Sequence, residues 1–200
     1  LGEGSAGLRL KSNMAGYDFS IMTARQMTPD RTAYDLPPKW ISGFDFAGDI
    51  FNGIGIWAEG AYKNRIFDGQ EIFDTDSSYF DLDAGFSYTF DSGMQGMVEY
   101  FYNGLGNTSS SYYNAGDFMN MFSGEMTGLG QSYALVSLSQ DFYDFYTTSA
   151  NVIMNINDQS YTAIPSITYS WNSDVSISIG ANIFIGGLDS EFGSLKSATI

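Results

Sequence analysis

Ionisable side chains show which chemistry is available to this chain, and their types exclude much of it. The 200 residues contain neither Cys nor His. Zinc centres that need thiolate or imidazole ligands, disulfides, and catalysis by a Cys or His nucleophile or base are therefore excluded. Carboxylates occur close together, as at Asp81 and Asp83, but nothing around them predicts a pocket for acid–base catalysis. We expect no enzymatic activity and no cofactor.

Charge is unevenly distributed along the chain. The net charge is −15, with seven basic and seven acidic residues in 1–65 but sixteen acidic residues and no Lys or Arg in 66–195. Phosphate binding requires clustered basic side chains, so nucleic acid is a poor candidate partner. An acidic surplus is also usual on solvated surfaces, so it does not by itself specify a function.

One acidic segment has enough oxygen ligands to attract Ca²⁺. Residues 67–76 include Asp68, Glu71, Asp74 and Asp76. Their spacing does not match an EF-hand loop. We therefore interpret the segment as a solvated loop and expect no metal site.

Alternation of apolar and polar residues is the dominant pattern, and it predicts β-strands. It is clearest in residues 79–90 and recurs in 147–157 and 175–185. Each run has about the 9 to 11 residues with which a tilted strand crosses a bilayer, and no stretch approaches the roughly 18 apolar residues of a membrane-spanning helix. If the chain crosses a membrane, it does so as strands.

The same reading predicts ten strands joined by alternately short and long connections. The strands are expected at 5–12, 16–26, 39–50, 54–65, 78–90, 94–103, 131–140, 146–157, 160–171 and 175–186, with an eleventh beginning at Leu195. Tight turns are expected at 13–15, 51–53, 91–93, 141–145 and 172–174, whereas 27–38, 66–77 and 104–130 are long polar loops. The connection at 158–159 is an exception, because it is short although it lies on the side of the long loops. In outer-membrane barrels, short turns face the periplasm and long loops face outward.

Aromatic residues gather towards the strand ends. Rings with an apolar body and a polar tip favour the headgroup layer, so two girdles are expected, although aromatic residues also suit any β-sheet. The residues concerned are Tyr17, Trp40, Tyr62, Tyr79, Phe90, Tyr102, Tyr146, Tyr161, Tyr169 and Trp171.

Essentially the whole chain resembles Gram-negative porin-like outer-membrane β-barrels. The amphipathic runs SYFDLDAGFSYTF and VSISIGANIFIGG carry this resemblance, as does the tail GGLDSEFGSLKSATI. The tail resembles the penultimate strand, last outer loop and start of the closing strand of such a barrel. The family's closing strand usually ends in an aromatic residue, whereas this sequence ends at Ile200. We therefore expect residues 1–200 to be a single all-β region, part of an antiparallel up-and-down transmembrane β-barrel, truncated at one or both ends.

Alternate residues of a strand face opposite sides, so the odd or even position of a residue (its parity) assigns it to a lipid face or to a pore face. Lipid-facing residues are expected to include Phe80, Leu82, Phe86, Val152, Ile177, Ile179 and Ile183. Pore-lining residues are expected to include Arg9, Lys11, Asp45, Asp49, Glu59, Lys63, Arg65, Asp81, Asp83 and Glu99. Arg25 has lipid-facing parity, but it lies at the predicted outer end, where it can reach headgroups or lipopolysaccharide phosphates.

The charged face supports two interpretations. An acidic wall beside a basic patch would create a transverse field that selects solutes by charge. Alternatively, cross-strand ion pairs, for instance between Lys63 and Asp81, fill a narrow interior. The loop 104–130 either folds inward as a constriction, packs on the outer rim, is a mobile surface loop, or is a surface loop that holds a short helix near 115–122.

These patterns favour an outer-membrane channel for passive diffusion of small hydrophilic solutes or ions. Its expected partners are membrane lipid and lipopolysaccharide. The resemblance also implies a homo-oligomer, because porin-like barrels are often trimers. One alternative is a non-conducting surface or adhesion protein that uses the barrel as an anchor. Another is a soluble β-sandwich binding module, in which the apolar face is a core.

Overall fold

The computed structural model describes residues 4–27, 38–66, 78–172 and 174–195, which form an antiparallel β-sheet with strands that follow chain order from β1 to β10. The strands are β1 (Ala6–Met14), β2 (Tyr17–Gln26), β3 (Lys39–Ile50), β4 (Ile54–Arg65), β5 (Ser78–Thr89), β6 (Gln95–Tyr102), β7 (Ser132–Phe142), β8 (Tyr146–Asn155), β9 (Ser160–Ser170), β10 (Ser176–Gly180) and β11 (Ile183–Ile185). Short helices are η1 (Phe51–Gly53), η3 (Ser110–Tyr112), α1 (Ala115–Phe122) and α2 (Glu191–Leu195). The predicted all-β, up-and-down arrangement is confirmed.

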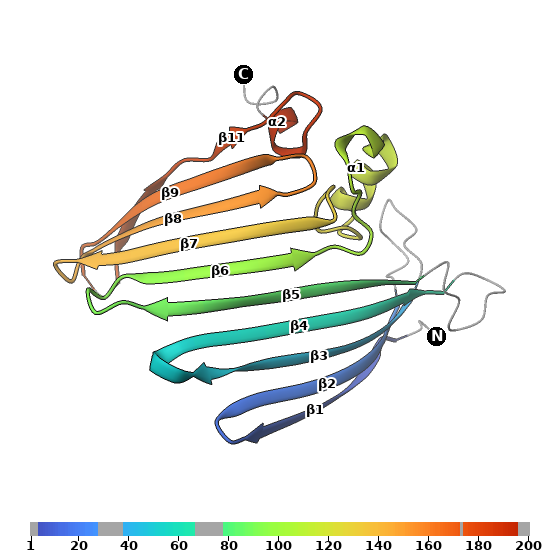
Figure 1. Ribbon diagram of the computed structural model, residues 1–200, viewed down its shortest axis with the longest axis horizontal. Coiled ribbons are helices and arrows are strands. Elements are labelled where there is room, and N and C mark those ends of the chain that lie inside the picture. Colours follow the sequence, from blue (N-terminus) through green and yellow to red (C-terminus); the bar gives the residue numbers. More distant parts are fainter. Residues whose placement is uncertain (1–3, 28–37, 67–77, 173, 196–200) are drawn as a thin grey trace.

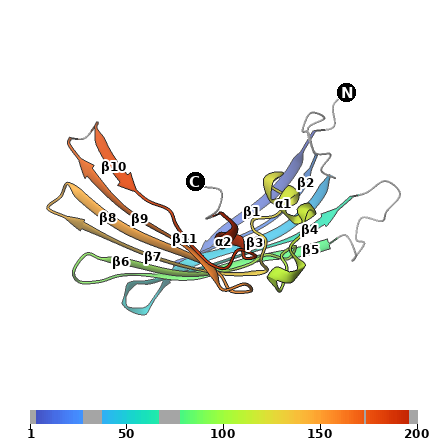
Figure 2. The same cartoon turned by 90° about the horizontal axis from the view of Figure 1, so that it is seen from above.

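The sheet is curved and open. Figure 2 shows it as a trough, with β1 and β2 on one wall and β10 on the other. Both α-helices lie at one end of the strands (Figure 1), on the side of the long connections. Within the described residues, β1 pairs only with β2, and β10 pairs only with β9. These strands are therefore the two edges of the sheet.

A proline divides the strand predicted at 175–186 into two. Gly180 pairs with Ser166 of β9 and Ile183 pairs with Ala163, so β10 and β11 keep one register. Pro165 lies opposite the gap between them and accepts a hydrogen bond from the N–H of Ala181 (3.1 Å). Because proline has no N–H to donate in return, the ladder is interrupted there.

The prediction of an eleventh strand beginning at Leu195 is wrong at that residue. Leu195 ends the helix α2, and residues 196–200 lie outside the described part of the chain. The side chain of Ser190 accepts a hydrogen bond from the N–H of Gly193, and the N–H of Glu191 donates to Asp158. These contacts satisfy N–H groups in the first turn of a helix, and they replace the extended conformation that the apolar pattern suggested.

Strand register sorts the side chains into two faces of different character. Paired residues share a face, so the register connects Leu10 with Ile21 and Phe44, and Val98 with Val136. Among the described residues only four hydrophobic side chains are buried, whereas 33 large hydrophobic side chains are exposed. Monomers in water rarely leave apolar patches of this size open.

All seven residues expected to face lipid share the parity of this apolar face. Phe80, Phe86, Ile177, Ile179 and Ile183 are exposed on it, and Leu82 and Val152 are half-buried. No second sheet covers the face in the described structure. The arrangement differs from a β-sandwich, in which two sheets enclose such residues in a core.

Aromatic rings cluster at the short-turn end of the strands. Tyr146 and Tyr169 have ring centroids 4.9 Å apart, and Trp171 lies 6.3 Å from Tyr169. Tyr79 does not belong to a girdle, contrary to the sequence-based expectation. It has the opposite parity and is only 7% exposed, because its ring packs beneath Lys63 and Arg65 on the polar face.

Candidate functional site

A band of carboxylates crosses the polar face of the trough. Asp45 of β3 is the direct cross-strand partner of Glu59 of β4, which in turn is the partner of Asp83 of β5. Glu99 of β6 lies opposite Gly85, one step further along the same face. Like charges directly opposite each other destabilise a sheet. The band therefore destabilises the sheet electrostatically, and packing alone does not explain why it is present.

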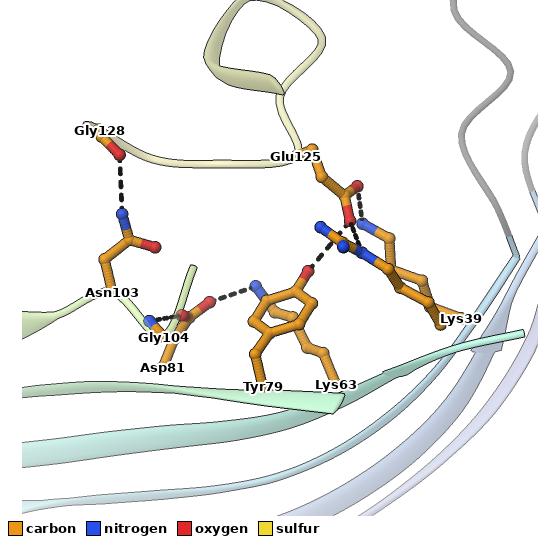
Figure 3. A network of polar contacts seen from close by, with 9 residues as sticks. Lys39, Lys63, Tyr79, Asp81, Asn103, Gly104, Glu125 and Gly128 are labelled. Carbon is orange, nitrogen blue, oxygen red and sulfur yellow. Dashed lines mark hydrogen bonds and ion pairs between the residues drawn. The ribbon is translucent and has the colours of Figure 1, made fainter. Parts of the chain in front are cut away.

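Four of the predicted pore-lining residues form two ion pairs. Arg9 Nη2 lies 2.6 Å from Asp45 Oδ2, and Lys63 Nζ lies 2.6 Å from Asp81 Oδ2. The second pair is the cross-strand pair predicted from the sequence. Asp81 also accepts a hydrogen bond from the N–H of Gly104 at 2.9 Å, as Figure 3 shows. Asp81 is therefore a structural residue at the base of the long loop.

Glu59, Asp83 and Glu99 have no such partner. Among the residues that the structure describes, no Lys or Arg forms an ion pair with any of them. Asp83 accepts a neutral hydrogen bond from Trp57 Nε1 (2.9 Å). The indole lies over Gly85, where an added Cβ would come within 2.3 Å of the ring. The glycine thus makes room for the group that orients Asp83.

Glu125 connects the long loop 104–130 to the strands β3 and β4. Its carboxylate is only 2% exposed and forms ion pairs with Lys39 of β3 and with Arg65 Nε of β4, the latter at 2.8 Å. The hydroxyl of Tyr79 donates to the same group at 3.4 Å. Figure 3 shows Glu125 reaching from the loop towards the side chains of these strands. Although burial by itself raises the pKa of Glu125, the hydrogen bonds from Lys39 and Arg65 outweigh it and lower the pKa.

The rest of the loop is held by hydrogen bonds from side chains and from the backbone. Asn103 donates from Nδ2 to the carbonyl oxygens of Gly128 (2.8 Å) and Gly130 (3.0 Å). The N–H of Asn107 donates to Leu129, which is completely buried. The predicted short helix near 115–122 is confirmed as α1, which begins with a capping box formed by Asn114 and Asp117.

Glu191 forms a second anchor at the other side of the trough. Its carboxylate accepts hydrogen bonds from Tyr133 Oη (2.6 Å), Asn155 Nδ2 (2.7 Å) and the N–H of Leu129 (3.2 Å). Burial raises the pKa of Glu191, and its three hydrogen bonds do not fully offset that effect. Segment 125–130 is therefore attached to β3 and β4 at one end and to β7, β8 and α2 at the other. It crosses the polar face of the sheet.

Two hollows lie on the polar face and meet at the loop. The first has a volume of about 440 Å³ and is lined by Arg9, Asp45, Glu59, Lys63 and Asp81, among others. The second has a volume of about 450 Å³ and lies over β6 to β8. Asp83, Phe101 and Thr127 line both. Thr127 belongs to the crossing segment, so the loop overhangs the place where the hollows join.

The structure places seven of the ten predicted pore-lining residues around the two hollows. These seven are Arg9, Asp45, Glu59, Lys63, Asp81, Asp83 and Glu99. Arg65 lines neither hollow but holds the loop above them. Lys11 and Asp49 share the parity of this face but line neither hollow. Lys11 pairs with Ser20 and Asp49 with Gly55.

Sequence reasoning missed the residues that hold the loop. Lys39 shares the odd parity of Asp45 on the same strand, so the alternation could have identified it. Glu125 and Glu191 lie outside the strands, where no periodic signal exists. The segment 67–76, with its four acidic residues, lies outside the described residues. In the described parts of the chain, no three His, Cys, Asp or Glu side chains are grouped closely enough to hold a metal ion.

The described helices are all too short or too polar to cross a membrane. Comparison of the chain with family models, with characterised proteins and with solved structures gave no match.

Proposed function

We propose that this chain forms part of the wall of a β-barrel in a bacterial outer membrane and that its polar face lines a channel for small hydrophilic solutes or ions. The observation that carries the proposal is the exposed apolar face. Val136 of the interior strand β7 is 41% exposed and Phe86 of β5 is 52% exposed. Contact with acyl chains would remove these side chains from water, each methylene contributing about 0.8 kcal/mol.

Strand geometry supports the same proposal. The strands β1 to β9 contain 8 to 12 residues, and a tilted strand needs roughly 9 to 11 to span a bilayer. Open edges are not tolerated in hydrocarbon, because each unpaired backbone group costs several kcal/mol. In a membrane, β1 and β10 would therefore pair with each other or with further strands. Closure with more than about eight strands leaves room for water.

The polar face supports passage of solutes. Its carboxylates and ion pairs would be costly in contact with lipid but are suited to a water-filled interior. Segment 125–130 crosses this face and would narrow the channel beside Glu59, Asp83 and Glu99. Because those three carboxylates have no basic partner among the described residues, the narrow part would favour cations.

Conductance in planar lipid bilayers tests the proposal. We expect the reconstituted protein to form channels that prefer K⁺ to Cl⁻ in a salt gradient. The double variant Asp83→Asn, Glu99→Gln should reduce this preference. A matched control, Asp91→Asn with Asp174→Asn, removes the same charge from exposed turns and should leave selectivity unchanged. Protein that inserts into the bilayer but never conducts would contradict the proposed function.

A further inference from the structure

The hollow over β6 to β8 differs in chemistry from its neighbour. Part of its wall is apolar and comes from three elements: Phe101 of β6, Leu135 of β7, and Phe192 of α2. Ile153 of β8 extends it, since Ile153 is the cross-strand partner of Leu135. The parity of these strands predicts a polar lining, so apolar side chains here depart from the pattern of the face. An apolar wall in a concave site is typical of a surface that binds the carbon skeleton of a ligand.

The remaining wall of this hollow is acidic. Asp83, Glu99 and Glu191 line it, and its lining contains no Lys or Arg. The sequence accounts for this, because residues 66–195 contain no basic residue at all. Glu191 is occupied by its three hydrogen bonds. Asp83 and Glu99 therefore supply the charge that a ligand would meet.

The neighbouring hollow allows the charges of two sites in the same protein to be compared. It has carboxylates too, but Arg9 and Lys63 also line it and form ion pairs with Asp45 and Asp81. An anionic or neutral solute meets both signs of charge there. In the hollow over β6 to β8, a cation meets negative charge on one side and an apolar wall on the other.

We propose that the hollow over β6 to β8 binds organic cations that carry an apolar group, such as an aryl or alkyl ammonium ion. The ammonium group would lie against Asp83 and Glu99, and the apolar group against Leu135, Ile153 and Phe192. The ring of Phe101 provides a further surface that attracts a cation. The volume of about 450 Å³ is within the range of small-molecule sites. The proposal rests on the proposed function, because passage along the polar face is what brings such solutes to this hollow.

Equilibrium dialysis of the detergent-solubilised protein against benzyltrimethylammonium tests the site directly. Protein-free micelles give the baseline for partitioning into detergent. We expect benzyltrimethylammonium to bind at least about ten-fold more tightly than tetramethylammonium, which lacks the ring, and than benzenesulfonate, which has the opposite charge. Equal binding of the three compounds to the wild-type protein would overturn the proposal without any variant being needed.

Two variants separate the contributions of charge and apolar contact. Asp83→Asn with Glu99→Gln should weaken binding of benzyltrimethylammonium by about ten-fold or more. Leu135→Gln with Ile153→Asn should abolish the preference for the compound with the ring. The matched control Asp91→Asn with Asp174→Asn should bind as the wild type does. Circular dichroism verifies that each variant is folded, and wild-type affinity in both folded variants would overturn the assignment of the site.

Conductance distinguishes failure of the site from failure of the channel. A protein that conducts but shows no preference among the three compounds retains the proposed function and loses the cation site. A protein that binds benzyltrimethylammonium selectively but does not conduct retains the site and loses the channel. In a conducting protein, we expect benzyltrimethylammonium to reduce the K⁺ current and the Asp83→Asn, Glu99→Gln variant to relieve that block.

Discussion

Glu125 is hydrogen-bonded to the ammonium group of Lys39, a residue 86 positions earlier in the chain. One partner lies at the start of β3, and the other lies in the connection between β6 and β7. The contact therefore ties segment 125–130 to strands on the far side of β5 and β6. Because Arg65 approaches the same carboxylate, a single acidic side chain fixes the loop at this side of the trough.

Removing the charge of Glu125 should release this end of the loop. Glu125→Gln leaves Lys39 and Arg65 without their anion, and loss of one partner of a buried ion pair typically costs about 3 to 5 kcal/mol. Only part of that cost should appear here, since Lys39 and Arg65 are 12% and 22% exposed. We expect faster chymotrypsin cleavage in 104–130, at aromatic residues such as Tyr112 and Phe122. The variant Asp91→Asn should be cleaved as slowly as the wild type, and equal rates for Glu125→Gln would show that the ion pairs do not hold the loop.

Acid should release the same end of the loop in the wild-type protein. The pKa of Glu125 is lower in the folded state than its ordinary value of 4.5. Its contribution to stability is therefore complete above pH 4.5 and is lost as the pH falls through the lowered pKa. Hydrogen exchange in 104–130, corrected for the intrinsic pH dependence, should stay constant above pH 5 and increase in more acidic solution. An equal increase in Glu125→Gln would assign the effect to other groups.

Glu191 should show the opposite pH dependence. Burial raises the pKa of this carboxyl above 4.5, so its contribution to stability is complete below pH 4.5 and is lost as the pH rises through the raised pKa. In Glu191→Gln the side chain stays uncharged. The difference in unfolding temperature between variant and wild type should therefore shift in favour of the variant as the pH rises from 4 to 8. Parallel pH profiles for the two proteins would contradict this assignment.

Much of the sheet could be predicted from the sequence because alternation depends only on local spacing. The strands at 39–50 and 54–65 have the predicted bounds, and the others differ by no more than a few residues apart from the break at 181–182, opposite Pro165. A strand that is apolar on one side and polar on the other can occupy one register only, since a shift by one residue exchanges its faces.

The candidate site could be predicted only in part because its shape depends on contacts between distant segments. The parity of Asp83 and Glu99 placed them on the polar face. Nothing in the local pattern indicated that Glu125 and Glu191 would hold segment 125–130 across the polar face. Tyr79 was misassigned for the same reason. The sequence does not distinguish an aromatic residue that lies among headgroups from one that lies beneath a loop, because both occur at strand ends.

A positive charge should have different consequences on the two faces of β7. Val136→Arg places a charge on the apolar face, where contact with mid-depth lipid costs about 2 to 4 kcal/mol. Ser137→Arg places the same charge on the polar face of the same strand. We expect the first variant to insert poorly into lipid vesicles and the second to insert as the wild type does, as measured by vesicle flotation. Equal insertion of both variants would mean that Val136 does not face acyl chains.

The central claim is that the apolar face contacts acyl chains while the polar face contacts water. Because the chain has no Cys, single cysteines at 134–139 of β7 can carry spin labels without background. In lipid bilayers, labels at Ala134, Val136 and Leu138 should be relaxed strongly by oxygen, and labels at Leu135, Ser137 and Ser139 by a water-soluble nickel chelate. Alternation of this kind with a period of two residues is the predicted result. Labels on both faces that respond equally to the nickel chelate would contradict the account.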